Sequence, residues 1–233
     1  MFDEFSEKMP FNEAVTRAGL EHALTGKNDT EAIKADFSKI FESALGHAYQ
    51  LYLTSEERAG NEVLNGYFKT NPSAPFGDLN KFFQSIAQSR KTRAGKAFEN
   101  VIKALFKKCD YPFAEQAVIN GKPDFLLPSK EHYNAKAMDC IVFTAKRTLR
   151  ERWRQIVTEG TKAYGFFLAT QDEDLTATQL KEMAANKIFV VVPQNVKAKI
   201  PNYVDANNVI SFEDFFEDYL DPAVARWKKQ GVI

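Results

Sequence analysis

The fold is decided by two apolar segments with charged residues at their ends: Gly121-Lys122-Pro123-Asp124-Phe125-Leu126-Leu127 and Cys140-Ile141-Val142-Phe143-Thr144-Ala145-Lys146. Each apolar run is short and hydrophobic enough to predict a buried strand. Asp124 lies at the start of the first strand, and Lys146 lies at the far end of the next one. If the two strands are adjacent, this carboxylate and this ammonium group meet at one edge of a sheet.

The sequence after residue 115 alternates between strand patterns and helix patterns. We expect strands at 117–119, 125–127, 140–143, 164–169 and 188–192. We expect helices at about 149–158 and 177–186, and two closing helices at 209–220 and 223–229. Such alternation indicates an α/β core in which helices cover a central sheet.

The N-terminal third has a helical pattern. Asp29-Thr30 is a candidate N-cap for one helix that buries apolar residues from Ile33 to Leu45. The segment Asn71–Pro75 interrupts the chain, and we expect a second helix around 79–86 and a third at about 93–107. These helices predict an N-terminal helical region that packs on the α/β core.

Length, charge and cysteine content restrict the class of protein. A chain of 233 residues fits one compact domain, with the helical region at 1–88 and the core at 89–233. Lys plus Arg equal Asp plus Glu at 31 each, but basic residues cluster at 90–108 and 146–154. Two cysteines exclude a disulfide framework and a thiolate zinc cluster within one chain. Without a signal-peptide run or a membrane-spanning stretch, we expect a cytoplasmic protein.

The residue types at the two strand ends suit phosphodiester hydrolysis. This reaction needs a divalent cation and an activated water, and hard cations prefer carboxylate oxygens. A nearby lysine can orient the water or offset the charge that develops on the phosphate. The acid that usually stands two residues before such a lysine is replaced by Thr144. A second carboxylate must come from elsewhere, and Glu159 is the candidate.

A second cluster, Arg150-Glu151-Arg152, follows Lys146 and has the chemistry of base recognition. Arginine pairs bidentately with guanine O6 and N7, and glutamate accepts a hydrogen bond from cytosine N4. Two arginines and one glutamate therefore match two consecutive G·C pairs. Consecutive residues cannot share one helix face, which favours docking into a groove over a solvated surface. In the upstream basic cluster, Arg90 and Arg93 are candidate phosphate contacts.

Together these segments resemble the catalytic region of the EcoRII and PspGI group of type II restriction endonucleases, over roughly residues 85 to 195. That group belongs to the PD-(D/E)xK nuclease clan and cuts double-stranded DNA at sites with a CC…GG core. In the group the second acid has moved from the strand to the following helix. Thr144 and Glu159 show the same departure here.

The resemblance implies a fold and a set of roles. It implies a restriction-endonuclease-like core with a central mixed β-sheet flanked by helices, Mg²⁺ as cofactor, and a homodimer acting on double-stranded DNA. The implied catalytic residues are Asp124, Lys146, Glu159 and Glu99, with Asp124, Glu159 and Glu99 as metal ligands. The implied base-reading residues are Arg150, Glu151 and Arg152, together with Gln88 from the minor-groove side.

Other interpretations of these segments stay open. A lone Pro-Asp pair is usually a turn, and the run 150–154 could be a solvated helix face. A DNA-binding protein that does not cleave and a repair nuclease on the same fold are the alternative functions. The residues leave the central bases undecided among CCGG, CCNGG and CCWGG sites.

Overall fold

The structure is a computed structural model of the whole chain. It describes residues 1–73, 75–119, 121–149, 163 and 165–233. The predicted helix at 149–158, with Arg150, Glu151, Arg152 and Glu159, therefore lies almost entirely outside the described residues.

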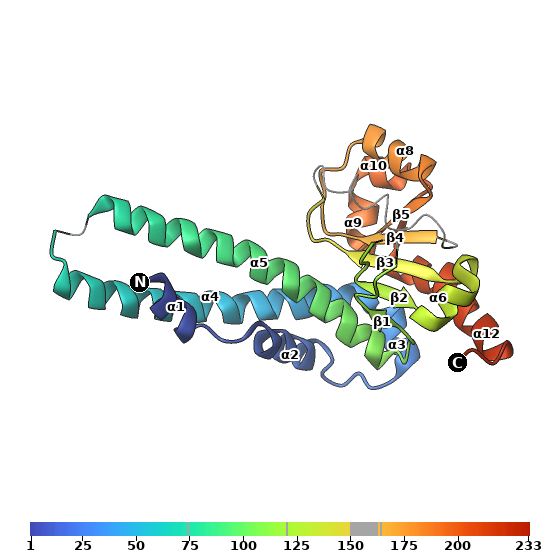
Figure 1. The fold of residues 1–233 in the computed structure, drawn as a ribbon, viewed down its shortest axis with the longest axis horizontal. Helices are drawn as coiled ribbons and strands as arrows, with labels where there is room; N and C mark the ends of the chain where they lie inside the picture. The colour runs from blue at the N-terminus through green and yellow to red at the C-terminus, as the bar shows by residue number, and fades with distance from the viewer. Residues whose placement is uncertain (74, 120, 150–162, 164) are drawn as a thin grey trace. The chain divides into compact units, whose positions relative to one another are not determined.

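The chain divides into two compact units, which we describe separately (Figure 1). The helical unit comprises Met1–Thr25 and Phe41–Val101, and the sheet unit comprises Gly26–Ile40 and Ile102–Ile233. Each of the two long helices, α4 (Phe37–Thr70) and α5 (Phe76–Lys108), contributes residues to both units. The prediction of a helical region 1–88 beside a core 89–233 stays a prediction.

The helical unit is built from α1 (Phe2–Lys8), α2 (Asn12–Ala23) and most of α4 and α5. Its core residues recur every three or four positions, so that one stripe of each helix is apolar. They are Phe5, Met9, Tyr52, Ala59, Val63, Phe82 and Ile86. Gly19 allows α2 to pack closely on α4, because a Cβ at this position would lie 2.3 Å from the carbonyl oxygen of Ala44.

Two helix predictions in the N-terminal half were wrong. The expected helix from residue 30 to 45 is two helices, α3 (Thr30–Ala35) and α4, separated at Asp36. The Asp36 carboxylate accepts from Lys27 Nζ at 2.5 Å and Lys39 Nζ at 3.0 Å, and Asp is a weak helix former. The expected separate helices at 79–86 and 93–107 form one helix, α5, because the polar residues between them include neither Gly nor Pro.

The sheet unit contains a six-stranded mixed sheet in the order β1-β2-β3-β4-β5-β6. The first three strands pair antiparallel, and β3 to β6 pair parallel. The strands are β1 (Ala114–Glu115), β2 (Phe125–Leu127), β3 (Ile141–Ala145), β4 (Gly165–Ala169), β5 (Ile188–Val192) and β6 (Val209–Ser211). This confirms the predicted mixed central sheet.

The sheet is apolar on both faces, which explains its uninterrupted hydrophobic strands. On one face, four phenylalanines occupy paired positions in neighbouring strands: Phe125, Phe143, Phe167 and Phe189. The first three pack against Phe106 or Phe215, and Phe189 packs against Phe167 and Tyr219. The opposite face carries Leu126, Val142 and Phe166. It is covered by side chains from α6 (Lys130–Lys136), α8 (Ala177–Ala185), α9 (Gln194–Lys199) and α10 (Pro201–Val204).

Two predictions near the ends of the sheet were also wrong. Residues 117–119 are not a strand, Val118 is 64% exposed, and the edge strand lies at Ala114–Glu115 instead. Residues 209–211 were expected to be helical but form β6, because they pair with β5. The helix begins only after Ser211, whose side chain forms a capping box with Asp214. The helical residues that follow are α11 (Phe212–Phe215), the π-helix η4 (Phe216–Leu220) and α12 (Asp221–Lys229).

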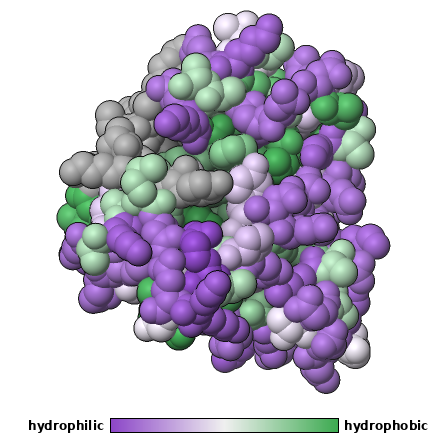
Figure 2. Space-filling model, turned by 90° about the vertical axis from the view of Figure 1, so that its right-hand side faces the viewer, coloured by the Kyte–Doolittle hydropathy of each residue, from purple (hydrophilic) through white to green (hydrophobic). Residues whose placement is uncertain are grey.

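The face drawn in Figure 2 is largely hydrophilic, with hydrophobic side chains in separate groups. None of the described helices is long and apolar enough to cross a membrane.

Candidate active site

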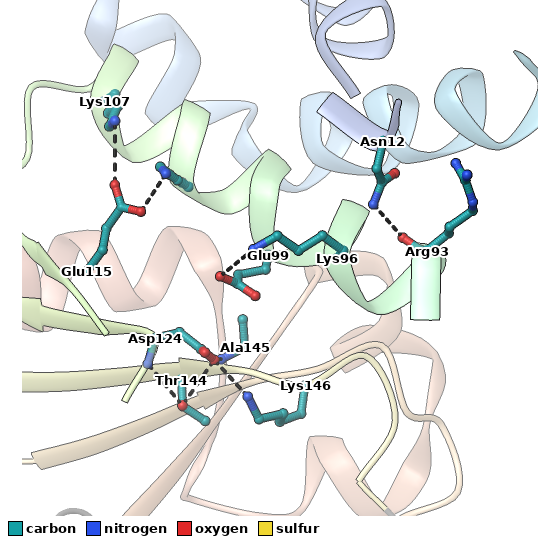
Figure 3. A network of polar contacts seen from close by, with 11 residues as sticks. Asn12, Arg93, Lys96, Glu99, Lys107, Glu115, Asp124, Thr144, Ala145 and Lys146 are labelled. Atoms are coloured by element: carbon teal, nitrogen blue, oxygen red, sulfur yellow. Dashed lines mark hydrogen bonds and ion pairs between the residues drawn. The ribbon is translucent and has the colours of Figure 1, made fainter. Parts of the chain in front are cut away.

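The antiparallel pairing of β2 and β3 forms the centre of the candidate site. Phe125 lies opposite Phe143, so the start of β2 meets the end of β3 at one edge of the sheet. Lys146 Nζ lies 2.9 Å from Asp124 Oδ2 across this edge (Figure 3). The prediction that two adjacent strands bring Asp124 and Lys146 together is confirmed.

The Asp124 carboxylate is buried and held by three donors on one oxygen. Asp124 is 6% exposed, and its Oδ2 accepts from Ala145 N at 2.7 Å, Thr144 Oγ1 at 3.1 Å and Lys146 Nζ. Among the described residues no hydrogen-bond donor is recorded for Oδ1. A carboxylate fixed through one oxygen presents the other in a defined direction, which suits the ligation of a hard cation.

Thr144 has a role that the sequence did not reveal. It occupies the position where an acid is usual, is 1% exposed, and donates its hydroxyl hydrogen to Asp124. An acid in its place would bring a second negative charge next to Asp124. The hydroxyl instead orients the remaining carboxylate, so Thr144 supports the site rather than leaving a gap in it.

The described residues do not by themselves form a metal site. No group of three or more His, Cys, Asp or Glu side chains gathers among them. Asp124 fits a divalent cation through Oδ1, which accepts no hydrogen bond from the described residues, and at least one further carboxylate is needed. Glu159 lies outside the described residues. Glu99 belongs to the helical unit, where its side chain is 20% exposed and accepts from Lys96 Nζ at 3.3 Å.

Gln88 lies on an exposed stretch of α5 in the helical unit. It lines a groove of about 580 Å³ together with Lys81, Ser85, Ser89 and Thr92. Neither Asp nor Glu is among the described residues that line this groove, so its charge suits an anionic partner.

Arg90 and Arg93 make contacts within the helical unit. Arg90 Nε donates to both carboxylate oxygens of Glu56, at 3.0 and 2.8 Å, and Arg90 Nη2 also donates to Glu56 Oε1. Arg93 Nη1 donates to the carbonyl oxygen of Pro10 at 2.8 Å, and its guanidinium lies over the ring of Tyr52. Both arginines therefore support helix packing, a role that the sequence analysis did not anticipate.

The mixed sheet with its flanking helices, and the Asp and Lys at one sheet edge, have the architecture of a restriction-endonuclease-like fold. The structure is similar to that of metal-depleted Ecl18kI in complex with uncleaved, modified DNA. The TM-score is 0.81 at 20% identity, over 97% of this chain and 82% of that one. It is also similar to the PspGI–substrate DNA complex, with a TM-score of 0.70 at 22% identity over 91% of this chain and 93% of that one.

Sequence comparison then defines the family. The family model described as EcoRII C terminal matches residues 55–216, and the chain belongs to this family. It is 34% identical over 140 residues to the type II restriction enzyme EcoRII of Escherichia coli, covering 56% of this chain and 35% of that enzyme. It is 29% identical over 150 residues to SsoII of Shigella sonnei, covering 59% of this chain and 48% of that enzyme. The matched regions span about a third and about half of these relatives.

Proposed function

We propose that this chain is a type II restriction endonuclease that cleaves double-stranded DNA at a palindromic site with a CC…GG core and requires Mg²⁺. The observation that carries the proposal is the buried Asp124 carboxylate, fixed by three donors with Lys146 beside it. The names of its relatives add support, because EcoRII and SsoII are called type II restriction enzymes. The Ecl18kI and PspGI structures are complexes with DNA.

The residues at the sheet edge divide the work of hydrolysis. Asp124 provides a carboxylate oxygen for the cation, and we propose Glu159 and Glu99 as the further ligands. When bound, Mg²⁺ would supply an acidified water and offset the negative charge of the phosphate. Lys146 has three donor hydrogens, so one can bond to Asp124 while another orients the water or a phosphate oxygen.

Recognition is assigned to the residues that follow the catalytic strand. We propose that Arg150, Glu151 and Arg152 read two consecutive G·C pairs from the major groove, because their donors and acceptor match guanine and cytosine edges. Gln88 would contact the same site from the minor-groove side, and Arg90 and Arg93 would add positive charge near the phosphates. A two-fold homodimer would place one such set on each strand of the palindrome.

Incubation with plasmid DNA tests the proposal directly. We expect discrete fragments with Mg²⁺ and none with EDTA, and sequencing of the fragment ends would define the site and the overhang. Asp124→Ala should abolish cleavage and retain DNA binding, and full activity in this variant would refute the assignment. Asp205→Ala provides a matched control, because this exposed aspartate follows α10, away from the strand ends that carry Asp124 and Lys146.

The same experiment separates the alternatives. A gel shift of duplex DNA without cleavage, under every divalent cation tested, would indicate a DNA-binding protein that does not cut. Cleavage restricted to damaged or branched DNA would indicate a repair nuclease. Either result would replace the restriction endonuclease proposal.

A further inference from the structure

The chain between Lys146 and Arg150 is tied to the loop that follows β4. Past the ends of the two strands, Lys146 N donates to Ala169 O at 2.9 Å and Gln171 N donates to Arg147 O at 3.3 Å. Thr170 Oγ1 also donates to Arg147 O, at 3.2 Å. The pairing of β3 with β4 therefore continues beyond the sheet.

Beyond this pairing, the side chain of Asp172 binds the backbone of the chain that follows β3. Its Oδ2 accepts from the backbone N of Leu149 at 2.8 Å, and its Oδ1 accepts from Asp174 N at 3.1 Å. The Leu149 side chain is completely buried in the core of the sheet unit. One buried side chain and one charge-assisted hydrogen bond thus fix the backbone immediately before Arg150.

The Asp172 backbone is itself held on both sides. Its N–H donates to Thr170 Oγ1 at 3.0 Å, and Tyr203 Oη donates to its carbonyl oxygen at 2.5 Å. Thr170 and Tyr203 are both fully buried, so two core residues hold the loop in place. A carboxylate on such a loop has little freedom to move away from Leu149.

We infer that Asp172 is a positioning residue for DNA recognition. It fixes the backbone at Leu149, the last described residue before Arg150, Glu151 and Arg152, and it holds that point in register with Lys146. The inference rests on the proposed function, since it assumes that residues 150–152 read bases.

The test compares four variants in binding and cleavage. Asp172→Ala removes both acceptors, Asp172→Asn retains one acceptor oxygen, Tyr203→Phe removes the donor that holds the Asp172 carbonyl, and Asp174→Ala is the control in the same loop. Gel shifts in EDTA and single-turnover cleavage in Mg²⁺ would use the mapped site and duplexes with one G·C pair changed. Discrimination is the ratio of the affinity, or of the cleavage rate, for the cognate duplex to that for the altered duplex. Urea unfolding reports stability separately.

Asp172→Ala should lower discrimination by about tenfold or more, because one misplaced base contact costs about that factor. The discrimination of Asp172→Asn should stay within a few-fold of the wild type, and that of Asp174→Ala should be unchanged. Tyr203→Phe should give a discrimination between those of Asp172→Asn and Asp172→Ala. If Asp172→Ala does not fold, the order of Asp172→Asn, Tyr203→Phe and the wild type decides the question. Unchanged discrimination in Asp172→Ala, or equal losses in Asp172→Ala and Asp174→Ala, would overturn the inference. A wild-type protein that does not discriminate would instead refute the proposed function.

Discussion

Replacing Arg90 with Met should destabilise the helical unit, in addition to any effect on DNA binding. Arg90 donates to both oxygens of Glu56, and the Glu56 side chain is only 9% exposed. In the variant this carboxylate keeps one donor among the described residues, Tyr52 Oη at 2.7 Å. A nearly buried charge would then keep one of the four hydrogen bonds that it accepts from the described residues.

The magnitude lies between two known limits. Breaking a fully buried ion pair by removing one partner costs about 3–5 kcal/mol, whereas exposed pairs contribute about 0–1 kcal/mol. Glu56 lies near the buried limit, but the Arg90 side chain is 50% exposed and is partly screened by water. We therefore expect a loss of about 2 kcal/mol, which corresponds to a fall in Tm of about 4–8 °C for a chain of this size.

The stability that the Glu56–Arg90 pair contributes depends on pH, with a defined sign. Burial raises the pKa of Glu56, but hydrogen bonds from Arg90 and Tyr52 outweigh it and hold the pKa below its ordinary value. A lowered folded-state pKa stabilises the protein above the ordinary carboxyl pKa, and this contribution is lost as the pH falls through the folded-state value. The stability difference between wild type and Arg90→Met should therefore be largest at neutral pH and shrink in acid.

Urea unfolding followed by circular dichroism measures the effect. Lys91→Met is the matched control, because Lys91 is the next residue on α5, is exposed, and has no polar contact recorded within the described part of the chain. Glu56→Gln completes a double-mutant cycle that isolates the coupling of the pair. Stability within about 0.5 kcal/mol of the wild type, with a salt dependence of DNA binding reduced by about one phosphate contact, would refute the structural reading of Arg90.

Two further variants or reagents test the sheet unit. Thr144→Val removes the hydroxyl that orients Asp124, so the single-turnover cleavage rate should fall about tenfold, the equivalent of one hydrogen bond; Thr144→Ser should restore it, and an unchanged rate in Thr144→Val would show that Ala145 N and Lys146 suffice. Burial raises the pKa of Cys109 to about 11 and that of Cys140 to about 12. Both thiols should therefore react with a disulfide reagent at pH 8 only after unfolding, and rapid labelling of the native protein would contradict this.

The central strands and the Asp124–Lys146 pair were predictable because local patterns determine them. A short apolar run between polar residues has few alternatives to a buried strand, and neighbouring antiparallel strands place the start of one beside the end of the other. The four phenylalanines paired across β2 to β5 follow from the same period-two alternation.

The errors occurred where a single residue or a distant contact decides the conformation. Asp36 interrupts a pattern that is otherwise continuous, through side-chain bonds to Lys27 and Lys39. The strand at 209–211 exists because β5 is available to pair with it, and no local pattern states this. Glu56 as the partner of Arg90 is 34 residues away, so a basic cluster was visible in the sequence while its internal acid was not.

The change from antiparallel to parallel pairing at β3 is what brings the functional groups to one edge. Because β2 is antiparallel to β3, its beginning carries Asp124 to the end of β3, where Lys146 lies. Because β4 is parallel to β3, its end and the following loop carry Asp172 to the same edge. An all-antiparallel sheet would send the loop after β4 to the opposite edge, and an all-parallel sheet would do the same to Asp124. Three strand ends thus bring the proposed catalytic carboxylate, its lysine and the carboxylate that holds Leu149 to one edge. A displacement of Leu149 would therefore shift the backbone that leads to Lys146, three residues earlier.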